Sequence, residues 1–421
     1  MVNICFYFQV HQPIRLRKYT IFDIGQKSDY FDEKKNKEIF EKVSKKCYKP
    51  MTKLLIELIK NNKQFKVSFS FTGIFLEQAL RYDPELVRLF KKLITHGTKT
   101  GQVEVLAETY YHSLSFIKDK DEFIEQIKLH NKIIRNIFNV NPKIFRNTEL
   151  IFRNDIAKII EDLGFKAILA EGADAILNGK SPNSVYQAFG TKLPILLKNY
   201  KLSDDIAFRF GDKKWKEYPL TPEKYAKWIN SIKGETINLF MDYETFGEHQ
   251  WADTGIFRFM KQFPKEFLKN KNNRFVTPSQ VIEKYQAREI LSFEEYVSWA
   301  DIERDISAWL SNNMQKDALN KIFEIKDEIK KNNNLQLLAD WRKLTTSDHF
   351  YYMCTKWFND GDVHKYFNPY DSPYECYISF MNVFNDIKLR LLKSKKLNVN
   401  KRNIIKLEYS FLKKKLENNK I

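Results

Sequence analysis

The segments Lys143-Ile144-Phe145-Arg146-Asn147-Thr148-Glu149 and Ile237-Asn238-Leu239-Phe240-Met241-Asp242-Tyr243-Glu244 decide the fold and point to a site. Each is an apolar, strand-like run that ends on a carboxylate. In a barrel built from strand–helix units, the carboxyl ends of the strands form the active face. Two such runs from distant parts of the chain predict that Glu149 and Asp242 converge there. A converging pair of acids is the layout that cleavage of an acetal bond requires.

The first 290 or so residues alternate between strand-like and helix-like patterns. Apolar strand-like runs occur at 2–8, 66–71, 102–106, 143–146, 167–169, 195–197, 206–210 and 237–241. Amphipathic helical patterns occur at 36–62, 85–96, 122–138, 154–163 and 222–232. Near-continuous apolar strands alternating with helices predict an α/β fold with a parallel sheet covered by helices. The number of units over this length favours a barrel over an open sheet.

The pattern changes after residue 290. Helical periodicity covers 302–331, 335–358 and 374–392, with few strand signals and no glycine before Gly361 in the first two stretches. No segment rich in Pro, Gly or Ser separates this part from the first. We therefore expect three regions: a catalytic barrel at 1–290, a helical subdomain at 291–392 that contributes to the active-site cleft, and a basic helical tail at 393–421.

The net charge of +18 raises the question of nucleic-acid binding. The tail from Lys393 to Ile421 holds ten Lys or Arg and two Glu, so much of the excess charge is concentrated there. A lysine-rich terminal helix is more often a solvated face or a docking element, and the rest of the chain mixes both signs. The charge pattern therefore argues against nucleic acid as the partner.

The N-terminal segment is apolar but lacks a basic start and a small-residue cleavage site, so it is expected to be a buried strand and not a signal peptide. No run approaches the ~20 apolar residues that span a bilayer. The four cysteines show no CxxC spacing, which indicates neither a zinc nor a redox site. We expect a soluble cytoplasmic protein, and its Lys and Glu content suits a thermophile, although an AT-rich genome explains Lys enrichment equally well.

Two further polar residues lie on or near predicted strands. His11 ends the first strand, where an imidazole can bind a hydroxyl or a metal, or can be structural. Glu104 lies in mid-strand among apolar residues, where a charge is costly unless it is paired or functional; a solvated edge position is the alternative. His112 follows this strand.

The two acids have distinct expected roles. Arg146, just before Glu149, can keep a neighbouring carboxylate ionised, as a nucleophile requires, although a helix-start position is the alternative for Glu149. Burial beside a second carboxylate can raise the pKa of Asp242, and Glu244 lies on the same side of the strand. A calcium site is a competing interpretation of this acidic pair, with too few nearby ligands to favour it. Trp251 in the following loop can serve as a platform for a sugar ring.

Several common chemistries lack their motifs. The chain has no G-x-S-x-G nucleophile elbow, no P-loop and no G-x-G-x-x-G. These absences argue against a Ser–His–Asp hydrolase and against the common nucleotide chemistries.

Five short regions, in order, resemble those of glycoside hydrolase family 57, the α-amylase and 4-α-glucanotransferase family. They are His11-Gln12-Pro13, Gly101-Gln102-Val103-Glu104-Val105, Arg146-Asn147-Thr148-Glu149-Leu150, Met241-Asp242-Tyr243-Glu244-Thr245-Phe246-Gly247 and Glu303-Arg304-Asp305-Ile306-Ser307-Ala308-Trp309-Leu310. The segments 346–352 and 367–374 resemble the helical part of amylase-like members. One departure is Pro13, which stands where some members carry a second histidine.

This resemblance implies a (β/α)7 incomplete TIM-like barrel with a C-terminal helical bundle, α-glucan substrates and a retaining mechanism. It makes Glu149 the nucleophile and Asp242 the acid/base. The substrate-binding residues expected with them are His11, Glu104, His112, Glu244, Trp251, Trp309, Asp348 and His349, with Trp309 stacking on a sugar ring. No metal and no cofactor is expected.

Three alternatives remain at this point. A 4-α-glucanotransferase would use the same site with a sugar acceptor in place of water. A metal-dependent polysaccharide deacetylase would need clustered ligands, and no His pair has the short i, i+4 spacing typical of that class. A non-catalytic glucan-binding protein is the third. The sequence does not give the linkage preference or the oligomeric state.

Overall fold

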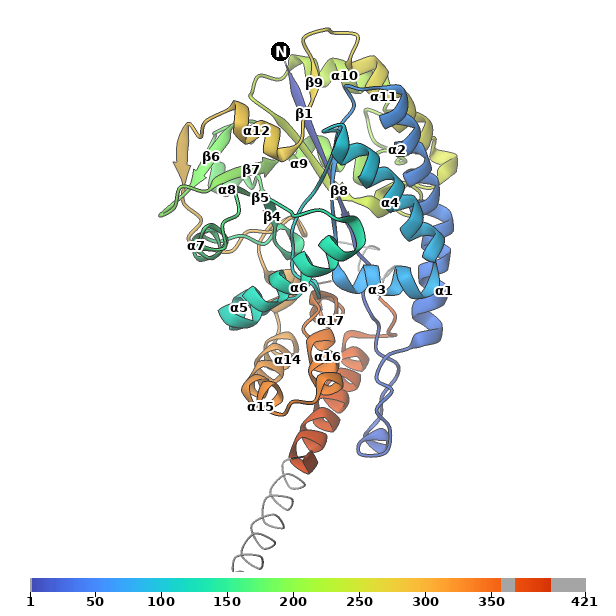
Figure 1. Ribbon diagram of the computed structural model, residues 1–421, viewed down its shortest axis with the longest axis vertical. Helices are drawn as coiled ribbons and strands as arrows, with labels where there is room; N and C mark the ends of the chain where they lie inside the picture. The colour runs from blue at the N-terminus through green and yellow to red at the C-terminus, as the bar shows by residue number, and fades with distance from the viewer. Residues whose placement is uncertain (1, 357–367, 395–421) are drawn as a thin grey trace, which may run out of the picture.

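The computed structural model describes residues 2–356 and 368–394. Ten strands form two five-stranded sheets, drawn in Figure 1. The strands are β1 (Asn3–Val10), β2 (Val67–Phe71), β3 (Val103–Val105), β4 (Ile144–Arg146), β5 (Ala167–Glu171), β6 (Val185–Ala188), β7 (Pro194–Lys198), β8 (Ile237–Asp242), β9 (Arg274–Phe275) and β10 (Glu289–Leu291). One sheet has the order β3-β2-β1-β8, with β9 also paired to β1, and the other has the order β10-β6-β7-β5-β4. Every pairing is parallel except β6 with β7. The predicted α/β class with parallel strands is confirmed.

The two sheets meet at both sides. Beyond β3 and β4, Ala107 forms a parallel bridge with Phe145. On the other side, the Asn199 N–H after β7 donates to the Asn238 carbonyl of β8 at 2.9 Å. A separate apolar cluster, which includes Tyr7, Leu169 and Phe240, is built from residues of both sheets. The carboxyl ends of strands from both sheets therefore lie around one opening.

The helices that precede residue 290 alternate with the strands. They are α1 (Glu33–Val43), α2 (Lys49–Asn61), α3 (Gly73–Tyr82), α4 (Pro84–Lys99), α5 (Ser115–Lys118), α6 (Lys120–Phe138), α7 (Asn154–Asp162), α8 (Asp174–Leu177), α9 (Tyr200–Ala207), α10 (Pro222–Ser231), α11 (Ile256–Phe267) and α12 (Pro278–Lys284). Several start as their sequences predict. Thr221 accepts from the Lys224 N–H ahead of Pro222, which starts α10.

Two expectations about this part are wrong. Residues 206–210 are not a strand, because the Asn199 side chain caps α9 and buries Leu202 and Ile206 at helical spacing. The helix α3 was not predicted, although Thr72 caps it by accepting from the Phe75 N–H. Its glycine start and the mixed apolar run conceal the helical period.

The helices after residue 290 lie below the carboxyl ends of the strands in Figure 1. They are α13 (Ser307–Leu310), α14 (Asn313–Glu324), α15 (Lys326–Lys331), α16 (Leu335–Leu344), α17 (Ser347–Tyr351) and a helix at 373–394. The two long helices expected at 302–331 and 335–358 are therefore broken. Caps at Asn312 and Asn334 start new helices, and a turn at 345–346 separates α16 from α17.

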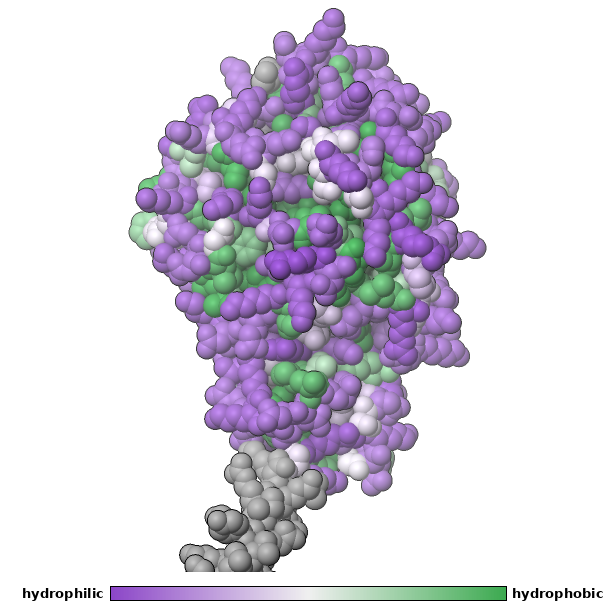
Figure 2. Space-filling model, viewed as in Figure 1, coloured by the Kyte–Doolittle hydropathy of each residue, from purple (hydrophilic) through white to green (hydrophobic). Residues whose placement is uncertain are grey.

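The helical region shares its core with the second sheet. Buried residues of α14, α16 and the helix at 373–394 belong to the same apolar cluster as those of β5 and α7. Hydrophilic residues cover most of the face seen in Figure 2, and the hydrophobic ones that reach it form separate patches. Among the described residues, no helix has both the length and the apolar character needed to cross a membrane. Most of the expected basic tail, from residue 395 on, lies outside the described residues.

A π-helical turn at Ser44–Tyr48 joins α1 to α2 and holds the loop that follows β8. The Cys47 thiol donates to the Tyr243 carbonyl at 3.2 Å, and Glu248 pairs with Lys46 at 3.4 Å. Gly247 has φ of +115°, and a Cβ on it would lie 2.2 Å from the Lys46 carbonyl oxygen. This close approach fixes the path of the chain immediately after Asp242.

Gly247→Ala should therefore destabilise the fold more than Gly164→Ala. Both glycines have positive φ, but a Cβ on Gly164 meets nothing within 4 Å. The left-handed conformation alone costs about 1 kcal/mol, and the backbone clash raises the loss at Gly247 to about 3 kcal/mol. Urea unfolding of the two variants checks this, and equal losses would contradict the packing argument.

Candidate active site

A pocket of about 610 Å³ opens at the carboxyl ends of the strands. Its walls come from three parts of the chain. The segment after β1 supplies His11, the end of β8 supplies Asp242, and α17 supplies Asp348. Glu149 also lines the pocket, and both it and Asp242 are only partly buried. The structure thus brings the two predicted acids to one accessible site.

Glu149 follows β4 in a tight turn and adopts φ of +56°. This left-handed conformation is unfavourable for a residue with a side chain, and such conformations are concentrated at functional sites. The turn presents both carboxylate oxygens to donors. Oε1 is 2.7 Å from His112 Nε2, and Oε2 accepts from the Trp299 indole N–H at 2.6 Å. Both contacts stabilise the ionised form of Glu149.

His112 lies between two carboxylates. Its Nε2 faces Glu149, and its Nδ1 is 3.5 Å from an oxygen of Glu108. Burial lowers the pKa of His112, but the hydrogen bonds to Glu108 and Glu149 outweigh burial and raise that pKa to about 9. The side chain is therefore an imidazolium at neutral pH, and both of its nitrogens are donors.

Two cations keep the pKa of Glu149 low. Burial alone raises the pKa of this carboxyl, but the hydrogen bond and charge of His112, together with the charge of Arg146, shift the pKa below its usual value. Arg146 is fully buried, 3.7 Å from Glu108, and its guanidinium carbon is 4.9 Å from the centre of a Trp299 ring. The expected effect of Arg146 on Glu149 is therefore present.

Asp242 is shifted in the opposite direction. Burial raises its pKa first, and the negative charge of Glu149 adds to the shift; Arg146 and His112 oppose it, leaving the pKa at about 7. Near neutral pH the site therefore holds one ionised and one largely protonated carboxyl. Two titratable groups with separated pKa values are the usual basis for dividing acid and base roles.

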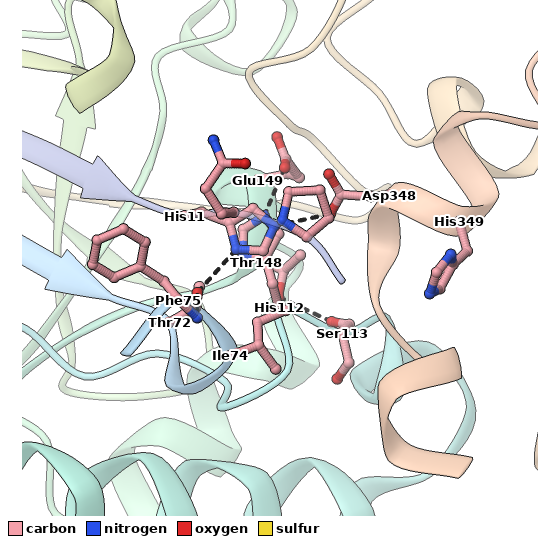
Figure 3. A network of polar contacts seen from close by, with 12 residues as sticks. His11, Thr72, Ile74, Phe75, His112, Ser113, Thr148, Glu149, Asp348 and His349 are labelled. Carbon is pink, nitrogen blue, oxygen red and sulfur yellow. Dashed lines mark hydrogen bonds and ion pairs between the residues drawn. The ribbon is translucent and has the colours of Figure 1, made fainter. Parts of the chain in front are cut away.

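A second network joins the strands to the helical region, as Figure 3 shows. His11 Nε2 is 3.0 Å from Asp348, and its Nδ1 is 2.9 Å from the Thr72 hydroxyl. Thr72 already accepts from a backbone N–H, so its hydroxyl donates to His11 Nδ1 and leaves the Nε2 proton for Asp348. The His11 and His112 rings stack with centroids 4.1 Å apart. Burial, as the largest cause, lowers the pKa of His11, which favours the neutral ring.

These two histidines and Asp348 offer ligand atoms that all lie within 4.8 Å of one another. This geometry fits a divalent cation, and the sequence spacing did not reveal it. The protonation of the residues does not fit one, because His112 is an imidazolium held by Glu108 and Glu149. A metal ligand must be a neutral imidazole, so binding would have to break both contacts. The hydrogen-bonded network is the better description of this cluster.

Glu244 lines the floor of the pocket behind Asp242. It accepts a short hydrogen bond from the Tyr48 hydroxyl, which the π-helical turn carries. Burial, with the charge of Asp242, raises the pKa of Glu244 well above its ordinary value. A neutral carboxyl at this depth can donate to a ligand as well as accept.

Four residues expected to bind substrate do not reach the pocket as expected. Glu104 lies away from it and accepts from the Ser279 backbone N–H at the start of α12 at 3.0 Å, so its charge is paired. Trp251 is 53% exposed outside the pocket, beside Lys46. His349 is buried, lies 3.2 Å from the Lys343 carbonyl, and stands apart from the network in Figure 3. Trp309 borders the pocket but is only 1% exposed, so it offers no ring face for stacking.

Sequence reasoning missed other residues of the site. Glu108 belongs to no predicted element, and only its position four residues before His112 was visible. Trp299 precedes the fifth motif and lies in a loop without periodicity. Lys198 and Arg304 form a buried ion-pair network with Glu171 and Asp204 at the edge of the pocket. A lysine at the end of the predicted strand at 195–197 was a usable signal.

The fold and the site define an α/β enzyme with a carboxyl pair at its strand ends. The model of glycosyl hydrolase family 57 matches residues 5–297. A candidate alpha-amylase of Methanocaldococcus jannaschii is 46% identical over 401 residues, which cover 91% of this chain and 84% of that protein. The chain therefore belongs to glycosyl hydrolase family 57 and is an α-amylase-like enzyme.

Solved structures agree in fold. The branching enzyme from Pyrococcus horikoshii gives a TM-score of 0.64 at 15% identity and covers 87% of each chain. The 4-alpha-glucanotransferase from Thermococcus litoralis gives a TM-score of 0.60 at 17% identity, over 83% of this chain and 56% of that one. At these identities the likeness concerns the fold alone.

The coupling of the two acids can be measured without an activity assay. In Glu149→Gln the pKa of Asp242 should fall from about 7, because the variant removes the negative charge that helps to raise it. Carboxyl ¹³C titration by NMR, with the Asp242 signal assigned by its loss in Asp242→Asn, checks this. An unchanged or raised pKa in Glu149→Gln would show that the two carboxyls do not interact.

Proposed function

We propose that the protein is a retaining glycoside hydrolase acting on α-1,4-glucans, with Glu149 as nucleophile and Asp242 as acid/base. The observation that carries this proposal is the opposite shift of two pKa values in one pocket: Glu149 is lowered and Asp242 is raised to about 7. A retaining mechanism needs an ionised nucleophile and a protonated acid at the same pH.

The first half-reaction breaks the glycosidic bond. A Glu149 oxygen attacks the anomeric carbon, and Asp242 gives its proton to the departing glycosidic oxygen. The product is a glycosyl-enzyme ester and a shortened glucan. As Glu149 loses its charge to the new bond, the repulsion that raised the pKa of Asp242 ends, which suits its next role as a base.

The second half-reaction releases the sugar. Asp242 takes a proton from the attacking hydroxyl, and the ester bond to Glu149 breaks. His112 and the Trp299 indole then stabilise the returning carboxylate through the two hydrogen bonds already described. His11, Asp348 and Glu244 line the pocket around the two acids and are placed to bind sugar hydroxyls.

Hydrolysis and glucanotransfer share all of these steps except the identity of the attacking hydroxyl. The relatives carry both names, since a 4-alpha-glucanotransferase of Thermococcus litoralis is 23% identical over 62% of this chain. Transfer is the alternative function, with the hydroxyl of a second α-glucan replacing water. The partner in either case is an α-glucan or maltooligosaccharide.

We further propose that the parallel strands make an incomplete (β/α)7 barrel and that the helices at 291–392 form a subdomain of the cleft. The bridge at Ala107 and the bond at Asn199 support the first proposal. The contribution of Asp348 to the pocket supports the second.

Glu149→Gln should abolish turnover of maltoheptaose, by at least about 10⁴-fold, because the amide cannot form the glycosyl ester. Chromatography of the wild-type products separates hydrolysis, seen as small sugars, from transfer, seen as redistributed chain lengths. Urea unfolding should show little loss of stability in the variant. Near wild-type turnover by Glu149→Gln would show that the nucleophile is misassigned.

Chelation should leave this turnover unchanged. The reason is that His112 is occupied by two carboxylates and holds its proton at neutral pH. The measurement is the rate before and after dialysis against EDTA, followed by addition of Zn²⁺. Loss on chelation with recovery on zinc would instead support a metal-dependent enzyme using His11, His112 and Asp348.

A further inference from the structure

The loop at 297–306 carries Trp299 into the site. It leaves Phe152 through a bridge at Val297, and the Trp299 backbone N–H donates to the Glu149 carbonyl at 3.2 Å. The indole N–H of the same residue donates to the Glu149 carboxylate at 2.6 Å. The position of this loop therefore sets one of the two hydrogen bonds that hold Glu149.

Arg304 attaches this loop to the second sheet. Its two terminal nitrogens form ion pairs with Glu171 at the end of β5 and with Asp204 in α9, both at 3.1 Å. Its guanidinium carbon lies 3.8 Å from the centre of the Tyr200 ring. A forked, planar cation can hold two carboxylates and an aromatic face at once, which a lysine cannot.

The backbone links Arg304 directly to the neighbour of Trp299. The Ser298 N–H donates to the Arg304 carbonyl at 2.9 Å, which closes the loop on itself. Arg304 has φ of +52° and Asp301 has φ of +54°, so the loop holds two unfavourable backbone conformations. Such conformations persist only where surrounding contacts over-determine them, and the ion pairs of Arg304 are contacts of this kind.

The ion-pair network is closed in charge. Lys198 lies 3.0 Å from Asp204 and 3.6 Å from Glu171, so two cations face two carboxylates. Glu171 is fully buried, and both Lys198 and Arg304 are mostly buried. Removing one member of such a network leaves an uncompensated buried charge, which costs far more than an exposed pair.

We propose that Arg304 is a positioning residue: by anchoring the loop at 297–306 to Glu171 and Asp204, it holds the Trp299 indole on Glu149. The proposal rests on the proposed function of Glu149. Arg304 acts through the loop, at a distance from the reacting atoms, and the chemistry itself stays with the two acids.

A double-mutant cycle tests the coupling. Arg304→Met and Trp299→Phe should each lower kcat for maltoheptaose about 100-fold, since each releases or removes the same donor. The double variant should lose about as much as either single variant, with KM changed less than about threefold in each case. Two independent effects would multiply to about 10⁴-fold, and that result would overturn the proposal.

Two further variants separate positioning from charge and from stability. Arg304→Met with Glu171→Gln restores the balance of charge, leaving Lys198 opposite Asp204, but does not restore the anchor. It should stay as slow as Arg304→Met, and recovery of wild-type kcat would show that only the charge mattered. Arg288→Met, which breaks an ion pair with Glu235 away from the pocket, serves as the matched control and should keep wild-type kcat.

A readout independent of turnover completes the test. The Trp299 indole ¹H–¹⁵N signal, assigned by its absence in Trp299→Phe, should shift in Arg304→Met and not in Arg288→Met. An unmoved signal in Arg304→Met would overturn the proposal. If the wild-type protein does not act on maltoheptaose, the proposed function fails, while this signal still decides whether Arg304 places the indole.

Discussion

A protonated imidazole between two buried carboxylates is the interaction on which the site depends. Without the charge on His112, Glu108 and Glu149 would face a largely buried environment with Arg146 as their nearest cation. Burial favours the neutral form of a carboxyl, so Glu149 would gain a proton and lose its nucleophilicity. Its lost charge would also lower the pKa of Asp242, to which it contributes. One cation thus maintains both halves of the acid–base division.

The acids themselves were predictable, because a carboxylate that ends an apolar strand has few structural explanations. Glu149, Asp242 and His11 all follow strands in this way, and each lines the pocket. The same logic failed at Glu104, which lies in mid-strand and finds its donors at the start of α12, a contact across the fold. A sequence gives the cost of a buried charge but not the partner that removes it.

The supporting residues lay beyond local reasoning. His112 and Glu108 belong to an irregular segment after β3, and Trp299 belongs to an irregular loop, so no periodicity marks them. In the fold, strand positions were predicted well wherever apolar runs were continuous. The run at 206–210 was misassigned because its helix is set by Asn199, several residues upstream. The helices after 290 were predicted too long because capping at Asn312 and Asn334 breaks an amphipathic period that continues across them.

The π-helical turn at Ser44–Tyr48 has a consequence for how this protein can change. A single extra residue in the turn puts α2 out of phase with α1, and it aims the Tyr48 hydroxyl at Glu244 beneath the pocket. Shortening the segment by one residue would restore an ordinary helix and swing the phenol about 100° around the axis, away from the carboxyl. Surface insertions elsewhere are tolerated by loops, whereas here the length of a helix is tied to the floor of the active site.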